Sequence, residues 1–447
     1  MTNRFDSLVL GGGVAGLTAA LQLAKRGAHV CLLEASDRLG GVVKTLRHDG
    51  CEVDVGPDVF LTRKPGAVEL AAALEVETRP ARGGALIQRD RQLVPLPAGL
   101  TGLVPGRLGP LITTRALGLG AKLRAAAEPL VPARSEDTDE SLEAFAVRRF
   151  GRGAWVGLIE PLLGGLYGAD DGPISLRSTL PHLHQLERQG GFLKLSRTAA
   201  REGSPFARPV GGMGTLVEAL ATAVRTQGGH IQTEARVARV ERADDGFMGT
   251  LADGTTRSSE TLIVALPAPW ASRVLATLDA DLAAPLDEIP MGSATAVVLG
   301  VASDGLAIPD GSGWLVPARE GGAVQAVTMF SAKHPGTAPD GHALFRVFLR
   351  PTFAHTASDE QAVDAALQHL RQLVGPVAPP VWTAVQRWRK VQPRYTLGHP
   401  DRLDALDAAV ATHPGLALIG ASLRGVGLPD VIRHAQSAAD QLQIPVS

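Results

Sequence analysis

Near the N-terminus, glycines and a carboxylate stand at a spacing that could bind a dinucleotide. Gly11, Gly13 and Gly16 follow the apolar run Leu8–Leu10 and open an alanine- and leucine-rich run. Glycines in this order allow a tight turn, a close approach of the backbone to a pyrophosphate, and close packing of a helix on a strand. Glu34 stands 21 residues after Gly13, where its carboxylate could accept hydrogen bonds from a ribose. The pattern predicts a strand, a glycine turn, a helix and a second strand, with the pyrophosphate at the helix N-terminus.

The segment after Glu34 bears on the choice between NAD and FAD. Arg38 could reach back to the pyrophosphate, and the Gly40-Gly41 pair could let the backbone pass beside a ribityl chain. This extension resembles the FAD-binding segment of the glutathione-reductase and amine-oxidase superfamily. The resemblance implies FAD as the cofactor.

A second glycine-rich loop lies near the C-terminus. The apolar run Leu416–Ile419 predicts a buried strand, and glycines 420, 425 and 427 separate it from a helical run over 431–440. Pro429 suits the first turn of that helix. Backbone N–H groups at such a helix end, aimed at a flavin, would stabilise the negative charge of its reduced form. The loop therefore supports a flavin site that uses both ends of the chain.

The elements between these two loops are of two kinds. A helix is predicted over 211–225, and alternating or apolar runs predict strands over 230–240, 246–251 and 261–266, with Asp253-Gly254 as a hairpin turn. Residues 86–205 have a helical pattern with Pro/Gly-rich breaks, and residues 291–353 contain several strand-like runs.

We therefore expect an α/β protein in which a Rossmann-like FAD domain of glutathione-reductase type is interrupted by a substrate domain. The substrate domain would combine a mixed sheet with a helical part. The expected division is a FAD domain formed by 1–85, 206–275 and 386–447, a helical region over 86–205, and a substrate-binding sheet over 276–385.

The segment 91–127 has an unusual charge pattern. It contains no acidic residue, and its basic residues interrupt a sequence rich in Leu, Val, Ala, Gly and Pro. Basic residues beside exposed apolar surface suit the anionic face of a membrane. An apolar helix pair buried against the substrate domain, with a basic rim, would have the same pattern. Both interpretations stay open.

Composition excludes several other classes. The 447 residues carry 44 basic and 45 acidic side chains, which is not the basic balance of a nucleic-acid-binding domain. Cys31 and Cys51 have neither a disulfide framework nor metal-ligand spacing. No apolar run reaches the length of about 18 residues that a spanning helix needs, and the N-terminus lacks a secretory pattern. We expect a cytoplasmic protein, with peripheral attachment to the inner face of a membrane as the alternative, and no metal or nucleic acid.

Beyond these features, the chain resembles the protoporphyrinogen oxidases, a family of the FAD-containing amine-oxidase superfamily. The resemblance covers nearly the whole chain and includes Gly56–Arg63, Glu140–Gly151, Pro161–Tyr167, Tyr395–His399 and the specific block Gly420–Asp430. It implies FAD contacts at Glu34, Val42, Val59, the backbone of Val237, Ala421, Val426, Gly427 and Leu428, in addition to those of Gly11, Gly13, Gly16, Arg38 and Gly41. It also implies that Arg63 lies near the cofactor and that Gly165 and Leu166 line a tetrapyrrole pocket.

The activity that this resemblance implies is oxidation of protoporphyrinogen IX to protoporphyrin IX. Six electrons would leave in three two-electron cycles, each ending with O₂ reoxidising the flavin and leaving as H₂O₂. No catalytic side chain is expected, because hydride passes to flavin N5 and the protein has only to position the substrate, exclude water and stabilise reduced flavin. The expected partners are the tetrapyrrole and O₂, and a homodimer stays open.

Two departures from the family pattern concern the substrate. Ala85 stands where many members have an arginine that pairs with a propionate, and His334 stands where a phenylalanine packs on the macrocycle. We expect Arg63, Arg82, Gly165, Leu166 and His334 to bind substrate, with Arg82, Arg89 or Lys333 replacing the missing arginine unless the substrate differs. The alternatives are coproporphyrinogen III as substrate, an amine oxidase or desaturase, and a non-catalytic flavin-binding scaffold. The two tyrosines and 4% aromatic content argue against the aromatic pair of an amine oxidase.

Overall fold

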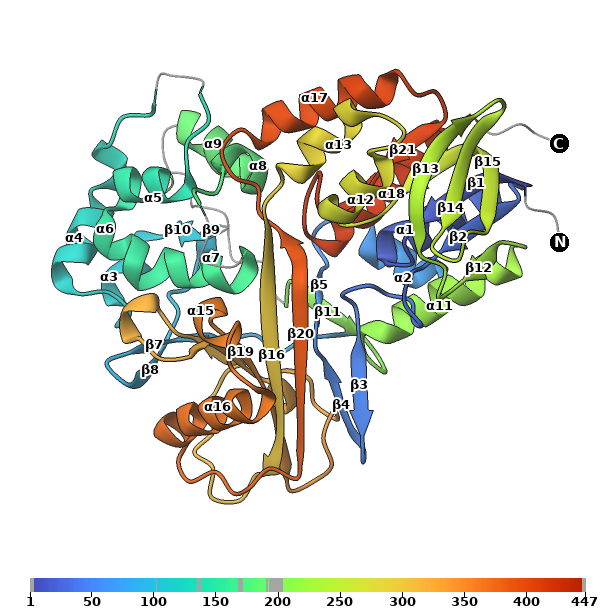
Figure 1. Cartoon of the computed structure of the whole chain (residues 1–447). Coiled ribbons are helices and arrows are strands. Elements are labelled where there is room, and N and C mark those ends of the chain that lie inside the picture. The colour runs from blue at the N-terminus through green and yellow to red at the C-terminus, as the bar shows by residue number, and fades with distance from the viewer. Residues whose placement is uncertain are drawn as a thin grey trace.

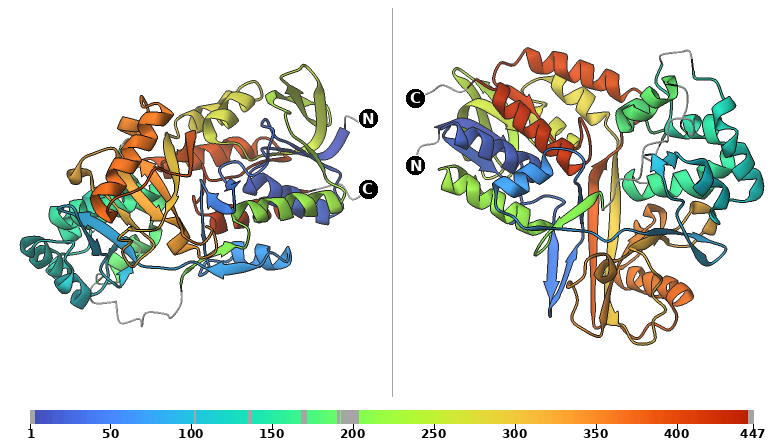
Figure 2. Two further views of the ribbon diagram at one scale, coloured as in Figure 1. Left: turned by 90° about the horizontal axis from the view of Figure 1, so that it is seen from below. Right: turned by 180° about the vertical axis from the view of Figure 1, so that it is seen from behind.

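The computed structural model describes residues 4–101, 103–134, 138–167, 172–189, 192 and 204–443. An α/β body that contains both ends of the described chain lies on one side, and a helical region lies on the other (Figure 1). The long strands β16 (Met291–Ala302) and β20 (Trp382–Pro393) run between them. The view from behind shows the same division (Figure 2).

The α/β body is built on a seven-stranded sheet. Its strand order is β12-β2-β1-β15-β14-β13, and β21 pairs with β15. Strands β12, β2, β1, β15 and β21 are parallel, whereas β13 and β14 join antiparallel. The strands are β1 (Arg4–Leu10), β2 (Val30–Leu33), β12 (His230–Gln232), β13 (Val237–Ala243), β14 (Gly246–Leu251), β15 (Thr256–Val264) and β21 (Leu416–Leu418).

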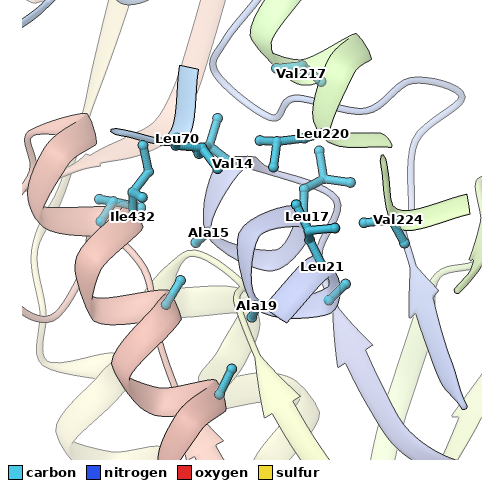
Figure 3. Close-up of a cluster of buried hydrophobic side chains, with 14 of the residues drawn as sticks. Val14, Ala15, Leu17, Ala19, Leu21, Leu70, Val217, Leu220, Val224 and Ile432 are labelled. Atoms are coloured by element: carbon cyan, nitrogen blue, oxygen red, sulfur yellow. The ribbon is translucent and has the colours of Figure 1, made fainter. Parts of the chain in front are cut away.

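Helix α1 (Val14–Lys25) is the centre of one face of this sheet. It packs between α11 (Met213–Thr226) and α18 (Leu428–Gln441), so segments from both ends of the chain share one core (Figure 3). Leu17 and Leu220 in this core are fully buried, and each such leucine contributes about 1.5–3 kcal/mol by leaving water. The predicted strand–turn–helix–strand unit and the helix over 211–225 are confirmed.

The predicted strand over 230–240 is wrong in one respect, because it is two strands. Residues 233–236 break it, and Glu234 has a positive φ of 55°. The first part, β12, pairs with β2, while the second, β13, pairs with β14. The alternating pattern continues through the break, so only the change of partner separates the strands. The predicted strand over 246–251 and the Asp253-Gly254 turn are confirmed.

A second seven-stranded sheet has the order β20-β16-β19-β18-β17-β7-β8. All neighbours are antiparallel except β17 and β7. Helix α16 (Asp359–Val374) packs on it through Ala362, Ala366 and Leu370. The remaining strands are β19 (His342–Leu349), β18 (Val324–Met329), β17 (Gly313–Leu315), β7 (Ala85–Arg89) and β8 (Gln92–Pro95).

The helical pattern predicted over 86–205 is wrong at its start. Residues 85–95 form the β7–β8 hairpin, and β9 (Leu100–Thr101) pairs with β10 (Val104–Pro105). Asp90 and Arg91 adopt the positive φ that turns the hairpin. The helices of this region follow: α3 (Leu108–Thr113), α4 (Leu119–Ala126), η1 (Glu128–Leu130), α5 (Leu142–Phe150), α6 (Arg152–Ala154), η2 (Trp155–Ile159), α7 (Glu160–Tyr167), α8 (Leu176–Thr179) and α9 (Pro181–Arg188).

Shorter elements connect these parts. Two small sheets have the orders β3-β4 and β5-β11-β6. The remaining bounds are β3 (Thr45–His48), β4 (Cys51–Asp54), β5 (Phe60–Leu61), α2 (Ala67–Ala73), β6 (Thr78–Pro80), β11 (Phe206–Pro209), α12 (Ala268–Leu275), α13 (Ala280–Asp287), η3 (Ala318–Glu320), α14 (Phe330–Lys333), α15 (Pro351–Ala354) and α17 (His399–Ala411).

Candidate cofactor site

In the first glycine loop, packing requires glycine at positions 11 and 16, whereas Gly13 faces open space. Gly11 has a φ of +105°, and a Cβ there would lie 2.8 Å from Ala265 O. A Cβ at Gly16 would lie 1.9 Å from Gly11 O, so the helix could not pack on the turn. A Cβ at Gly13 would meet no atom of the described residues within 4 Å. Gly13 therefore borders open space at the N-terminus of α1.

The Glu34 carboxylate lies beside this loop. Its Oε2 accepts a hydrogen bond from Gly12 N–H at 2.7 Å, and its Oε1 accepts from Ser36 N–H and Ser36 Oγ–H at 2.8 and 2.7 Å. An ionised carboxylate has about four lone-pair sites on its two oxygens, so it can accept a further hydrogen bond from a ribose hydroxyl. The end of β2 thus places the acid beside the glycine turn.

Arg38 organises the segment that follows. Its guanidinium donates to Leu39 O at 3.1 Å and to Gly41 O, and it lies 5.7 Å from the centre of the Trp388 ring. Burial lowers the pKa of Arg38 from its ordinary value, against the opposing effect of Glu34. Gly40 N–H donates to Gly12 O at 2.8 Å, so the two glycine turns lie together. Arg38 holds this arrangement, and its reach to a pyrophosphate stays a prediction.

The C-terminal glycine loop is held by two aromatic side chains whose role the sequence did not reveal. Tyr395 Oη donates to Ala421 O at 2.6 Å, and His399 Nε2 donates to Leu423 O at 2.9 Å. The two rings stack at 4.2 Å, and burial lowers the pKa of His399. The signal was present in the Tyr395–His399 block of the resemblance, but only tertiary structure shows what these rings hold.

The other residues expected to contact FAD lie at element ends and keep some exposure. Val42, Val59, Val237, Val426, Gly427 and Leu428 are all exposed or half-buried. Val42 closely approaches Gly56, where a Cβ would lie 1.9 Å from Val42 O. Gly427 is the N-cap residue of α18.

These residues fit FAD in three respects. Gly13 and Gly427 precede α1 and α18, and glycine has no side chain that could occupy the first N–H groups of those helices. Open space borders Gly13 and also Gly420 within the described chain. Glu34 supplies the acceptor for a ribose. The residues that would hold FAD are therefore the two glycine loops, Glu34 and the segment 38–42.

The expected substrate residues come from several elements of the structure. Arg63 and Arg82 are exposed. Arg63 precedes Lys64, whose Nζ lies 2.7 Å from Asp430 in the first turn of α18, so Arg63 is on the cofactor side. The backbone N–H of Arg82 donates to Lys333 O at 3.0 Å. Because Lys333 precedes His334, Arg82 lies near His334.

Gly165 and Leu166 lie in α7. The preceding Gly164 O accepts a hydrogen bond of 2.7 Å from Gln325 Nε2 on β18. Helix α7 therefore lies over the second sheet.

Sequence reasoning did not predict the partners of Asp58, which form what we call the Asp58 cluster. Lys333 Nζ, His334 Nε2 and an Nη of Arg346 lie 2.7, 3.0 and 3.1 Å from its carboxylate oxygens. Burial alone would raise the pKa of Asp58, but Arg346, Lys333 and His334 outweigh it and hold the pKa well below its ordinary value. His334 is itself buried, and burial lowers its pKa despite Asp58.

An α/β sheet with a glycine loop, a ribose-binding acid and a second glycine loop from the far end of the chain defines a flavoprotein. The comparison with protein families agrees. The chain belongs to the flavin containing amine oxidoreductase family, whose model matches residues 14–443. This confirms the α/β flavoprotein fold and FAD as the cofactor.

Similar proteins narrow the class to the porphyrinogen oxidases, FAD-dependent oxidoreductases to which this chain belongs. It is 34% identical to the "Coproporphyrinogen III oxidase" of Propionibacterium freudenreichii subsp. freudenreichii, over 97% of this chain and 90% of that protein. It is 30% identical to the protein of the same name from Bacillus subtilis (strain 168), over 96% of each. A solved structure, "Putative protoporphyrinogen oxidase" from Exiguobacterium sp. 255-15, has a TM-score of 0.85 at 27% identity and covers 98% of both chains.

Two further features are absent from the described part of the chain. No helix there is long and apolar enough to cross a membrane. No group of three or more His, Cys, Asp or Glu side chains there could hold a metal ion.

Proposed function

We propose that this chain oxidises coproporphyrinogen III to coproporphyrin III, in place of the protoporphyrinogen IX expected from the sequence. The observation that carries this choice is full-length similarity, at 34% and 30% identity, to relatives named for coproporphyrinogen III. Protoporphyrinogen IX is the second candidate substrate.

We propose that FAD binds in the manner of glutathione reductase, with its pyrophosphate at Gly13 and the N-terminus of α1. Glu34 would bind the adenosine ribose, and the N-terminus of α18 would face the flavin edge. Bound FAD supplies the two-electron acceptor, so six electrons leave the porphyrinogen in three turnovers, each with one O₂ reduced to H₂O₂. The chain itself binds and orients the macrocycle and excludes water, so no side chain has to transfer a proton or form a covalent bond.

The macrocycle would lie between the second sheet and α7, with its carboxylates directed toward exposed cations. Arg82 is the best placed replacement for the missing arginine, because it is exposed and lies three residues before Ala85. Arg63 would serve a carboxylate on the cofactor side, and Gly165 and Leu166 would line the pocket from α7. His334 is buried against Asp58, so we propose that it influences substrate binding through its neighbour Lys333.

The decisive experiment follows the colour of the flavin. The purified yellow protein is mixed anaerobically with coproporphyrinogen III and, separately, with protoporphyrinogen IX. We expect bleaching of the flavin and, after air is admitted, porphyrin fluorescence, both faster with coproporphyrinogen III. Faster reaction with protoporphyrinogen IX would reverse the choice of substrate. Bleaching with neither, in protein that dithionite still reduces, would exclude the proposed function and favour an amine oxidase, a desaturase or a flavin-binding scaffold.

We also propose that the α3–α4 surface contacts a membrane peripherally. Leu108, Ile112, Leu119, Leu123 and Leu130 are 45–84% exposed there, while Leu111, Leu117 and Ala125 are buried in the helical core. Arg107 and Arg115 are exposed beside them. Both figures place α3 and α4 at the end of the molecule remote from the chain ends (Figures 1 and 2). Basic and exposed apolar side chains together suit an anionic bilayer.

Vesicle flotation tests this contact. The wild-type protein should float with vesicles that contain phosphatidylglycerol and less with pure phosphatidylcholine, and Leu119→Ser with Leu123→Ser should abolish flotation. Equal behaviour of wild type and double variant would exclude the contact. Sedimentation of the wild type would show whether the protein is a homodimer. A dimeric wild type with a monomeric double variant would assign the dimer interface to this surface.

A further inference from the structure

The segment 54–60 connects β4 to β5 and passes close to the cofactor site. It contains Val59, an expected FAD contact, and Gly56, which lies against Val42. Strand β4 packs against β19 of the second sheet, and Figure 1 shows the β3–β4 hairpin next to the long strands of that sheet. The segment therefore lies between the flavin-binding part and the substrate sheet.

The backbone of this segment accepts hydrogen bonds from two side chains of the second sheet. Arg346 Nη1, on β19, donates to Asp54 O at 2.6 Å and to Gly56 O at 2.8 Å. Trp388 Nε1, on β20, donates to Val55 O at 2.9 Å. The carbonyls of three consecutive residues are thus held from one direction.

The Asp58 cluster adds a fourth attachment. All its cations come from the second sheet and the helix beside it, because Lys333 and His334 belong to α14 and its C-cap and Arg346 belongs to β19. The Arg346 and Asp58 side chains are 4% and 9% exposed. A guanidinium binds such groups through a rigid planar fork, whereas an ammonium is a single point. Arg346 can therefore hold the carboxylate and the two carbonyls together.

A second arginine, from β11, also holds this segment. Arg208 Nε, on β11, lies 2.6 Å from Asp54 Oδ2. The guanidinium carbons of Arg208 and Arg346 lie 5.4 and 5.6 Å from the centre of the Phe330 ring. Asp54 also accepts from Met213 N–H, at the start of α11, at 2.9 Å. The segment is thereby tied both to the second sheet and to α11 of the α/β body.

We propose that Arg346, Asp58 and Trp388 form a clamp that sets the position of the flavin-binding segment 54–60 relative to the substrate sheet. In this proposal Arg346 and Asp58 are positioning residues for electron transfer from the substrate and touch neither substrate nor flavin. The part that concerns substrate rests on the proposed function, and the part that concerns FAD does not.

The clamp matters because the reaction depends on a short distance between two atoms. Reacting atoms have to approach to about 3–3.5 Å, and a displacement of about 1 Å can lower a rate about 100-fold. FAD is held by the α/β body, whereas the macrocycle would rest on the second sheet. A clamp between those two parts is therefore the structural feature that fixes the distance.

Arg346→Lys tests the clamp, because it keeps the charge but loses the fork. The purified holoenzyme is examined for its visible flavin spectrum, for FAD affinity after reconstitution of the apoprotein, and for the limiting rate of anaerobic flavin reduction by coproporphyrinogen III. We expect a shifted spectrum, FAD binding weakened at least several-fold, and a limiting rate lowered about 10- to 100-fold with little change in KM. Reduction by dithionite should stay complete.

Arg148→Lys is the matched control. Arg148 also binds two carboxylates in a largely buried cluster, those of Glu140 and Glu187, at nitrogen-to-oxygen distances of 2.5 and 2.6 Å. Unlike Arg346, it lies in the helical region. It should lower stability without changing the flavin spectrum or FAD affinity.

Unchanged spectrum, FAD affinity and limiting rate in Arg346→Lys would overturn the clamp, and so would equal changes in Arg148→Lys. If Arg346→Lys does not fold, Trp388→Phe is used instead, since it loses the hydrogen bond to Val55 O but keeps an aromatic ring beside Arg38, and it should show the same shifts at smaller size. If no porphyrinogen reduces the wild-type flavin, the proposed function fails, but the spectrum and FAD affinity still decide the clamp.

Discussion

Two buried ion-pair clusters of this molecule are alike in chemistry and different in place. The Asp58 cluster joins one carboxylate to Lys333, His334 and Arg346. The second, which we call the Glu187 cluster, joins Glu128, Glu140 and Glu187 to Arg148 and Arg149. In both clusters, carboxylates pair with cations in positions that are largely shielded from solvent.

The difference lies in what each cluster connects. The Glu187 cluster joins helical segments that all lie between residues 128 and 187 of the helical region. In the Asp58 cluster, Lys333 and His334 follow Asp58 by 275 and 276 positions in the sequence. The cluster therefore joins the edge of the flavin-binding part to the second sheet. Removing one partner of a buried pair is destabilising wherever it lies. Only at a junction between cofactor and substrate parts should it also change the chemistry.

The largest expected effect on stability comes from Glu187→Ala. Of the carboxylate partners in the described chain, Arg148 would keep only Glu140 and Arg149 only Glu128, and breaking such buried pairs costs up to about 3–5 kcal/mol. Urea unfolding should show the loss, and the folded fraction should keep its wild-type flavin spectrum. The exposed Glu143, which pairs with Arg152, supplies the control, because Glu143→Ala should change stability by less than about 1 kcal/mol. An altered flavin spectrum in Glu187→Ala would remove the distinction between the clusters.

Gly13→Val should give folded but colourless protein and leaves both clusters intact. The backbone of Gly13 is extended, and a side chain would enter open space, so folding survives while the pyrophosphate position is filled. The expected loss of stability is that of the bound ligand, about 2.7 kcal/mol at a free FAD concentration 100 times Kd. Absorbance near the flavin band and thermal unfolding measure both effects. Retained flavin would contradict the assignment of the loop.

A smaller effect is expected from pH in the Asp58 cluster. Burial lowers the pKa of His334, and the positive charges of Lys333 and Arg208 lower it further, whereas Asp58 raises it. As pH falls, His334 therefore becomes protonated in the unfolded chain before it does so in the folded protein. The stability contributed by neutral His334 is present above the unfolded pKa of about 6.5 and is lost as pH falls through the folded pKa. Melting temperatures from pH 8 to 5 should fall less steeply for His334→Gln than for wild type. Parallel curves would show that His334 does not titrate in this way.

Local signals in the sequence were sufficient for much of the fold. The glycine spacing at 11, 13 and 16 predicts the turn and α1, since Gly11 and Gly16 answer steric needs within a few residues or against an adjacent strand and Gly13 leaves open space at the helix N-terminus. The Asp253-Gly254 pair predicts the turn between β14 and β15. These signals are local, so one stretch of sequence contains both the element and its cause.

Signals that depend on distant partners were misread or missing. Residues 85–95 look like part of a helical region but form strands, because β7 pairs with β17 more than two hundred residues later. The run over 230–240 alternates throughout, yet it divides where its partner changes from β2 to β14. Nothing around Asp58 indicates that Lys333, His334 and Arg346 surround it.

A dinucleotide site was thus predicted by the sequence alone, because its glycines and its acid stand at fixed short spacings, whereas FAD and the class of chemistry followed from the resemblance to a known family. The relation between the FAD site and the substrate sheet was decided only in the tertiary structure. Arg346 reaches Asp54 and Gly56 because β4 packs against β19, and no short-range pattern encodes that packing. The distance between cofactor and substrate is a property of how distant segments pack, and the side chains that set it are identified only where those segments meet.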